Sequence, residues 1–134
     1  MISLSAMEAV AGARLKDAEV LLASRRLDGA VYLCGYAVEI ALKVRVCKTL
    51  KWTEFPLSAS EFKRLKLKSF MTHDLDTLLR LSGIEQEIKT SLMVEWSIVT
   101  RWDPQVRYKP IGRAKQQDAD EMIASSNKLL EVLL

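Results

Sequence analysis

Residues that interrupt helices, bind metals or form disulfides are scarce in this chain of 134 residues, which has five glycines, three prolines, two cysteines and one histidine. With so little Gly and Pro, and with plentiful Ala, Leu, Lys and Glu, the composition favours helix over strand. A single histidine and two distant cysteines exclude a zinc site made from the usual ligands within one chain. We therefore expect neither a metal nor a cofactor.

Motifs of several enzyme classes are also missing. The chain has no GxxxxGK[ST] and no GxGxxG, so it has no standard phosphate-binding loop. It has no GxSxG either, and no Ser-His-Asp set stands out. Carboxylates are numerous, but their spacing indicates no general acid/base pair.

Long apolar runs and excess charge are absent as well. The longest apolar run, residues 30–41, contains Glu39 and is too short to span a bilayer. Residues 1–12 lack the basic leader and continuous apolar core of a signal peptide. We therefore expect a cytoplasmic protein without membrane contact. The net charge of +3 is mild, and a solvated surface explains it more simply than a nucleic-acid partner does.

Apolar residues recur every three or four positions and predict an all-α, up-and-down bundle of five or six helices, in a single domain over residues 1–134. The second helix is apolar almost all round and belongs in the centre. It carries Gly35, which lets a neighbouring helix approach, and Cys34 and Cys47, which lie about 20 Å apart and are expected as reduced core residues. The predicted helices cover residues 5–26, 29–50, 61–70, 73–82, 84–101 and 113–134.

Polar residues in front of these helices predict their caps. The expected caps are Ser5 with Glu8 as a capping box, Asp28, Ser58 or Ser60, and Thr72.

Two segments, RLKDAEVLL at 14–22 and LDGAVYLCGYAVEIALK at 27–43, resemble the opening helical hairpin of the HEPN family (higher eukaryotes and prokaryotes nucleotide-binding domain). The segments HDL at 73–75 and WDPQVRY at 102–108 resemble one branch of it, so the resemblance covers nearly the whole chain. It implies an all-α bundle that forms homodimers. Many members pair with a minimal nucleotidyltransferase as toxin and antitoxin, and some are metal-independent ribonucleases.

The ribonucleases of that family carry an Arg, four to six residues, and then a His, and the dimer brings two copies together. Here the permitted positions before His73 hold Lys66, Leu67 and Lys68, and Arg64 lies further upstream. Lysine attracts a phosphate but lacks the planar fork of arginine. As a catalyst, His73 would exchange protons near neutral pH. We prefer the simpler role, in which it caps a helix or packs a loop.

Two further groups are candidate phosphate or nucleotide ligands. The basic cluster of Lys63, Arg64, Lys66 and Lys68 either holds a phosphate backbone or forms a solvated helix face, and the sequence does not separate these roles. The second group follows in the loop of residues 102–112.

Within that loop, Arg107 and Tyr108 offer a phosphate contact and a stacking contact, beside Asp103. The simpler interpretation is that Trp102 and Tyr108 anchor the loop and Arg107 makes a local salt bridge. Tyr32 and Tyr36 line either a cleft or a dimer interface.

Glu39 interrupts the buried second helix, and a buried carboxylate needs a partner. Arg14 falls on the apolar face of the adjacent helix, so we predict a structural ion pair between Arg14 and Glu39.

Three functions follow, in order of preference. The first is a HEPN-like homodimer that binds nucleotide or RNA, as the non-catalytic partner of a minimal nucleotidyltransferase in a toxin–antitoxin pair. The second is a metal-independent ribonuclease toxin that uses His73 with Lys66, Lys68 or Arg64. The third is a structural dimerisation module.

Overall fold

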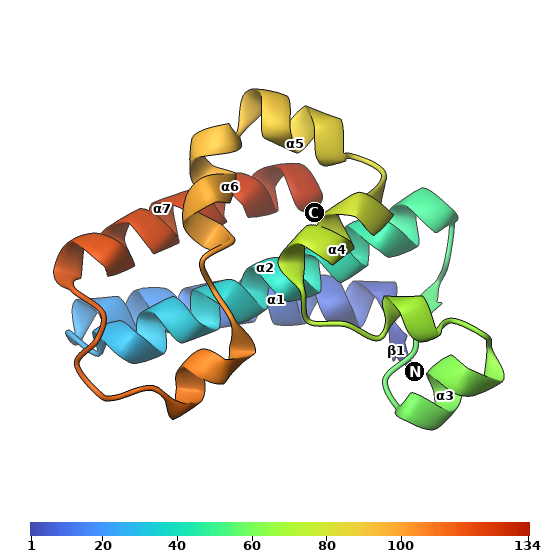
Figure 1. The fold of residues 1–134 in the computed structure, drawn as a ribbon, viewed down its shortest axis with the longest axis horizontal. Helices are drawn as coiled ribbons and strands as arrows, with labels where there is room; N and C mark the ends of the chain where they lie inside the picture. The colour runs from blue at the N-terminus through green and yellow to red at the C-terminus, as the bar shows by residue number, and fades with distance from the viewer.

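The computed structural model describes residues 1–134, and it confirms the all-α class (Figure 1). Two short 3₁₀ helices and one pair of two-residue strands complete the fold. The elements are β1 (Ile2–Ser3), α1 (Leu4–Ala23), α2 (Leu27–Leu50), β2 (Glu54–Phe55), α3 (Ala59–Arg64), η1 (Lys68–Phe70), α4 (Leu75–Ser82), α5 (Glu85–Ser91), α6 (Met93–Val99), η2 (Pro104–Tyr108) and α7 (Gln116–Leu133).

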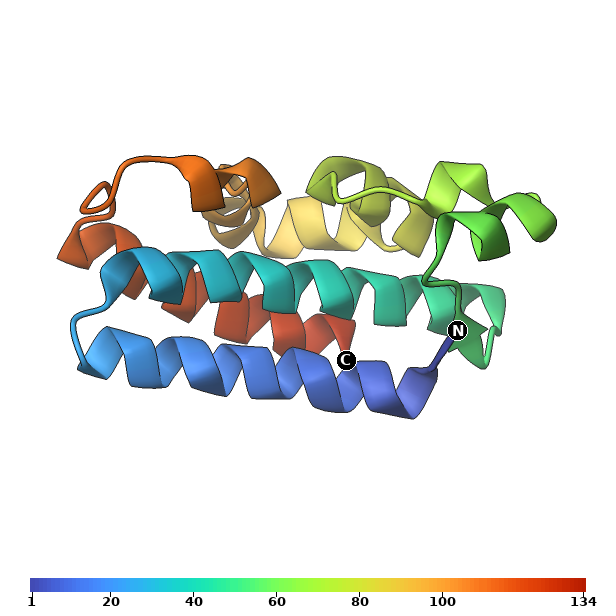
Figure 2. The same cartoon turned by 90° about the horizontal axis from the view of Figure 1, so that it is seen from below.

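Helix α2 lies at the centre, as its almost continuous apolar sequence predicts. It contacts α1 as an antiparallel hairpin, α7 alongside, and α4 and η2 on the side opposite α1 (Figure 2). None of the helices combines the length and the apolar character that crossing a bilayer requires.

The core has two parts, and α2 contributes to both. The larger part joins α1, α2, α4, α5, α6 and α7, and the smaller one lies under β1, β2 and α3. Cys34 and Cys47 are buried free thiols, as predicted. Burial raises the pKa of Cys34 to about 12 and that of Cys47 to about 11, so both thiols are inert packing residues.

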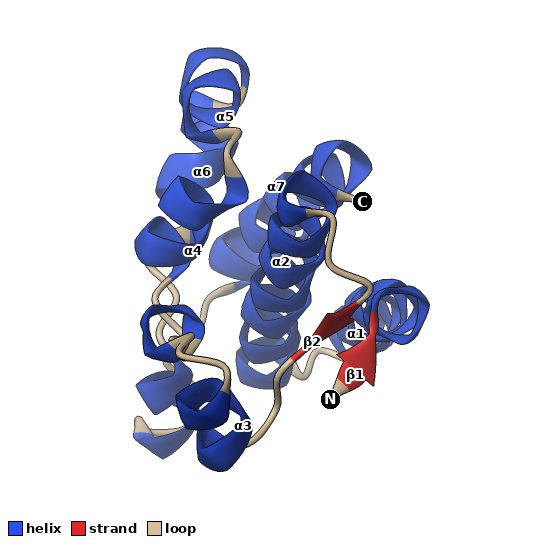
Figure 3. Ribbon diagram, turned by 90° about the vertical axis from the view of Figure 1, so that its right-hand side faces the viewer, coloured by secondary structure: helices blue, strands red, loops and turns tan.

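The first helix begins one residue earlier than predicted. Ser3 is its cap, accepting a hydrogen bond from the Ala6 N–H at 3.2 Å, so the capping box predicted at Ser5 and Glu8 is wrong. The chain before α1 pairs with residues 54–55 as an antiparallel ladder, with Ile2 opposite Phe55 (Figure 3). Strands this short show no alternation in the sequence, which is why none was predicted.

The predicted caps further along the chain have mixed outcomes. Ser58, one of the two predicted candidates, caps α3, and it forms a capping box with Glu61 that was not predicted. Helix α4 is capped by Asp74, and Thr72 instead accepts a hydrogen bond from the Asp74 N–H at 3.0 Å. Asp28 lies in the first turn of α2, and its side chain serves a distant loop, as described below.

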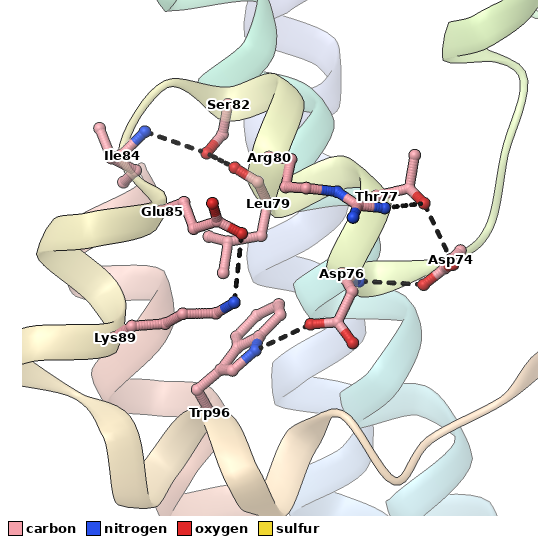
Figure 4. Close-up of polar contacts among 10 residues, drawn as sticks. All are labelled: Asp74, Asp76, Thr77, Leu79, Arg80, Ser82, Ile84, Glu85, Lys89 and Trp96. Carbon is pink, nitrogen blue, oxygen red and sulfur yellow. Dashed lines mark hydrogen bonds and ion pairs between the residues drawn. The ribbon is translucent and has the colours of Figure 1, made fainter.

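The single helix predicted over residues 84–101 is two helices. The backbone of Leu92, at φ −131° and ψ 36°, separates α5 from α6. The break lets Ile88 and Trp96 both enter the core. Trp96 also donates its indole N–H to Asp76 of α4 at 3.2 Å (Figure 4), which ties α6 to α4.

The C-terminal end of α7 is held by cations of α2. Arg45 donates to the carbonyls of Val132 at 2.8 Å and Leu133 at 3.2 Å, and Lys48 donates to the carbonyl of Leu134. These carbonyls have no partner within their own helix, and cations there also favour the helix dipole.

Candidate functional site

An aromatic cluster joins α2 to the segment before η2. The ring of Tyr36 lies 5.0 Å from that of Tyr32 and 5.1 Å from that of Trp102, both edge to face. The buried indole of Trp102 donates to the Tyr32 carbonyl at 3.1 Å. Gly35 allows this approach, because a Cβ atom there would lie 2.1 Å from the indole. The predicted close approach therefore exists, but its partner is a side chain and not a helix.

Beside this cluster lies a cavity of about 430 Å³, here called the Arg107 cavity. Tyr32 and Trp102 are among its lining residues. Cations and carboxylates also line it. The cations are Arg101, Arg107, Lys109 and Arg113, and the carboxylates are Asp28, Asp118 and Glu121.

Asp28 fixes the loop that carries two of these cations. Its carboxylate accepts hydrogen bonds from the Gly112 N–H at 2.6 Å and the Ala114 N–H at 2.8 Å. These bonds lower the pKa of Asp28 below its usual range, and the bond from Ala114 has the largest effect. The loop between η2 and α7 is thus fastened to the start of α2, with Lys109 and Arg113 placed at the cavity.

The three residues predicted from the loop have different roles. Asp103 caps η2 by accepting from the Gln105 N–H at 2.7 Å. Arg107 lines the cavity and makes no ion pair, and its guanidinium lies 4.9 Å over the ring of Tyr108. The hydroxyls of Tyr32 and then Tyr108 raise the pKa of Arg107.

Two parts of the simpler interpretation of this loop are wrong. Tyr108 is 73% exposed, so it does not anchor the loop, and Arg107 makes no salt bridge. Trp102 is the anchor, as predicted.

A second polar group gathers around Glu39, which is only 2% exposed. One carboxylate oxygen accepts from Lys43 Nζ at 2.7 Å and lies 2.7 Å from His73 Nδ1. The other oxygen, Oε2, is buried without a hydrogen-bond partner. Because an ionised carboxylate only accepts hydrogen bonds, the proton of this contact belongs to Nδ1 of His73.

The ion pair predicted between Arg14 and Glu39 does not form. Arg14 pairs instead with Asp17 of its own helix at 2.8 Å, and both side chains are largely exposed. Helical periodicity indicated that Arg14 shares a face with apolar residues, but its flexible side chain reaches solvent from there. The partners of Glu39 come from its own helix and from the segment before α4.

His73 lies at the edge of a smaller, mainly apolar cavity of about 310 Å³, here called the His73 cavity. Lys43 lines it too, with Ile40, Phe55 and Phe62 among the apolar residues. The site thus combines an oriented imidazole, a cation and an apolar wall.

The predicted basic cluster lines neither cavity. Phe62 of α3 points inward and is buried, whereas the cations around it are exposed and make no ion pair. These cations are Lys63, Arg64, Lys66 and Lys68. Lys63 and Arg64 lie on α3, Lys66 lies in the turn that follows, and Lys68 begins η1.

Sequence analysis missed most residues of the Arg107 cavity. Arg101, Lys109 and Arg113 were not singled out, although residues 101–115 carry five cations and a single carboxylate. That local excess of positive charge was the available signal. No group of three or more His, Cys, Asp or Glu side chains is placed to hold a metal ion.

Comparison of the chain with models of known protein families, with curated proteins and with solved structures gives no match. The resemblance to HEPN domains therefore remains a prediction from the sequence, and the function has to be argued from the two cavities.

Proposed function

We propose that the chain binds the phosphate and base of a nucleotide or of RNA in the Arg107 cavity. One observation carries the proposal: four cations surround an aromatic-lined cavity of about 430 Å³, and none of them is in an ion pair. A guanidinium group can donate two parallel hydrogen bonds to the oxygens of one phosphate, and aromatic rings stack on bases.

The carboxylates of the cavity do not cancel this charge by direct contact. Asp28 accepts two backbone hydrogen bonds, Asp118 accepts from the Lys115 N–H at 3.0 Å, and Glu121 accepts from the Gln117 amide at 3.0 Å. No ion pair joins any of these three carboxylates to a cation of the cavity, and the four cations outnumber them.

Binding of mononucleotides and of short RNA at several salt concentrations tests the proposal. We expect Arg107→Ala combined with Arg113→Ala to weaken binding at least tenfold and to make it less dependent on salt, because two phosphate contacts are lost. Lys89→Ala is the matched control, since Lys89 is an exposed cation paired with Glu85 on α5 (Figure 4). Equal binding by both variants and the unaltered protein would refute the proposal.

We propose further that the chain works as a HEPN-like homodimer beside a minimal nucleotidyltransferase. The resemblance of the α1–α2 hairpin to HEPN domains supports this. Light scattering of the purified chain tests the dimer, and co-purification with a small nucleotidyltransferase tests the pairing. A dimer without affinity for nucleotide or RNA would instead indicate a structural dimerisation module.

A metal-independent ribonuclease is the second candidate, and the contact between His73 and Glu39 favours it. The buried carboxylate contacts the imidazole through Nδ1, on a side chain that is 63% exposed. Such a group can accept the proton of an RNA 2′-hydroxyl as it attacks the adjacent phosphate. In a dimer, the second copy of His73 would protonate the departing oxygen.

RNA cleavage in excess chelator, compared with that by His73→Ala, tests this candidate. Cleavage that the substitution abolishes would establish the ribonuclease. Cleavage that persists in the variant, or no cleavage by either protein, would argue against the ribonuclease. Nucleotide or RNA binding would then be the only remaining proposal for this site.

A further inference from the structure

The His73 cavity is a mainly apolar space at one end of the bundle. Its walls come from α1, α2, β2 and α3, and Figure 1 shows α3 at the end where α1 begins. Phe55 and Phe62 of these walls are only 2% and 4% exposed, whereas Leu57 and Met71, which also line the cavity, are 63% and 49% exposed. Exposed apolar side chains gathered beside a cavity are typical of a ligand-binding groove. The cavity therefore suits the apolar part of a ligand.

The polar groups of the cavity can all donate hydrogen bonds, and no carboxylate lines it. These groups are Lys43, Thr72 and His73. The ammonium group of Lys43 lies 5.7 Å over the ring of Phe55, so this cation stands against the apolar wall. It donates one hydrogen bond to Glu39 and has two further protons, and the hydroxyl of Thr72 also has a proton to donate. The polar part of a ligand in this cavity is therefore expected to accept hydrogen bonds.

The charges around these donors favour an anion. Glu39 lies outside the lining, and its carboxylate is matched by Lys43 at 2.7 Å. The imidazolium form of His73, which also contacts Glu39 at 2.7 Å, adds a second positive charge to this one negative charge. One positive charge is then left for a ligand, and hydrogen bonds from a cation to a carboxylate are about twice as strong as neutral ones.

We propose that the His73 cavity binds the anion of a medium-chain fatty acid, with its tail against the two phenylalanine rings and its carboxylate on Lys43 and His73. At about 310 Å³ the cavity stands at the lower end of the range of about 300–1,000 Å³ that small-molecule sites occupy, so we expect a tail of about eight carbons. The proposal goes beyond nucleotide binding, because the two cavities share no lining residue.

Calorimetric titration with butyrate, hexanoate, octanoate and octanol tests the proposal at about pH 6, where the imidazolium form of histidine is populated. We expect each added methylene group to tighten binding about fourfold, which is the effect of removing it from water. Octanol has the same tail without the charge, and it should bind about tenfold more weakly than octanoate.

Three variants locate the ligand. Leu57→Glu places a carboxylate beside the cavity on an exposed side chain, and it should weaken octanoate binding about tenfold. Val94→Glu is the matched control and should bind octanoate like the unaltered protein, because Val94 is 70% exposed on α6 and lines neither cavity. His73→Gln removes the imidazolium charge, so it should keep the affinity for octanol and lose the preference for octanoate.

The opposite results would overturn the proposal. Equal affinity of the unaltered protein for octanoate and octanol would do so, as would binding of neither. Octanoate binding by Leu57→Glu as tight as that by Val94→Glu, with both variants folded by circular dichroism, would place the ligand elsewhere. All three variants should bind nucleotides like the unaltered protein, so failure here is distinguishable from failure of the nucleotide site.

Discussion

Replacement of Gly35 by Ala tests how the aromatic cluster is built. A Cβ atom at position 35 would lie 2.1 Å from three atoms of the Trp102 indole, whereas ordinary contacts begin at 3.4 Å. The ring would have to move by more than 1 Å. That shift would break the hydrogen bond from the indole to the Tyr32 carbonyl.

The magnitude follows from three contributions. Ala is favoured over Gly inside a helix by about 1 kcal/mol. Overpacking a core costs about 1–3 kcal/mol, and loss of the indole hydrogen bond costs about 1 kcal/mol more. We therefore expect a net loss of about 2 kcal/mol in the free energy of unfolding, which for a chain of this size lowers the melting temperature by about 8 °C.

The assay is thermal and urea unfolding, and the matched control is Gly12→Ala. Gly12 also lies inside a long helix, but nothing stands within 4 Å of its added Cβ atom. The control should gain about 1 kcal/mol from helix propensity alone. The same substitution is thus expected to change stability in opposite directions at the two positions. A Gly35→Ala protein as stable as the control would refute the close approach of Trp102.

Three further predictions concern stability. Lys43→Met should cost about 3 kcal/mol, because it leaves buried Glu39 without its cation, and adding Glu39→Gln should recover most of the loss in urea unfolding. A double variant as unstable as Lys43→Met alone would contradict the pairing. The N-terminal ammonium group, with the Leu57 and Ser58 N–H groups, lowers the pKa of Glu61 to about 2. The ionised Glu61 side chain therefore stabilises the fold above the ordinary pKa of about 4.3, and this contribution is lost as pH falls toward 2. Glu61→Gln should flatten the fall in melting temperature between pH 5 and pH 2, and an unchanged slope would count against the contact. Trp96→Phe removes the bond to Asp76 and should cost about 1 kcal/mol, with no change expected in nucleotide binding.

The sequence was sufficient for much of the fold because apolar periodicity reports which face of each helix is buried. It identified α2 as the central helix, and it indicated the need for a close neighbour at Gly35. It did not reveal the break at Leu92, because apolar residues continue at helical spacing through that position. The pairing of strands β1 and β2, in which Ile2 lies opposite Phe55, also has no local pattern in the sequence that predicts it.

The candidate sites were less accessible from the sequence because their contacts join distant segments. Glu39 was known to need a partner, but periodicity does not say which segment covers a given face. The sequence therefore predicted Arg14 as the partner of Glu39, whereas in the structure the partners are His73 and Lys43. Arg107, a predicted candidate ligand, lines a cavity, whereas the fastening of its loop by Asp28 depends on a contact 86 residues away in the sequence.

The bonds from Arg45 to the end of α7 also bear on the order in which the chain folds. The α1–α2 hairpin forms between neighbours in the sequence, whereas Arg45 and Leu133 are separated by 88 residues. Contacts of such long separation close the largest loops and tend to form after the local ones. We therefore expect α7 to dock last, so that Arg45→Ala speeds unfolding and leaves the folding rate nearly unchanged.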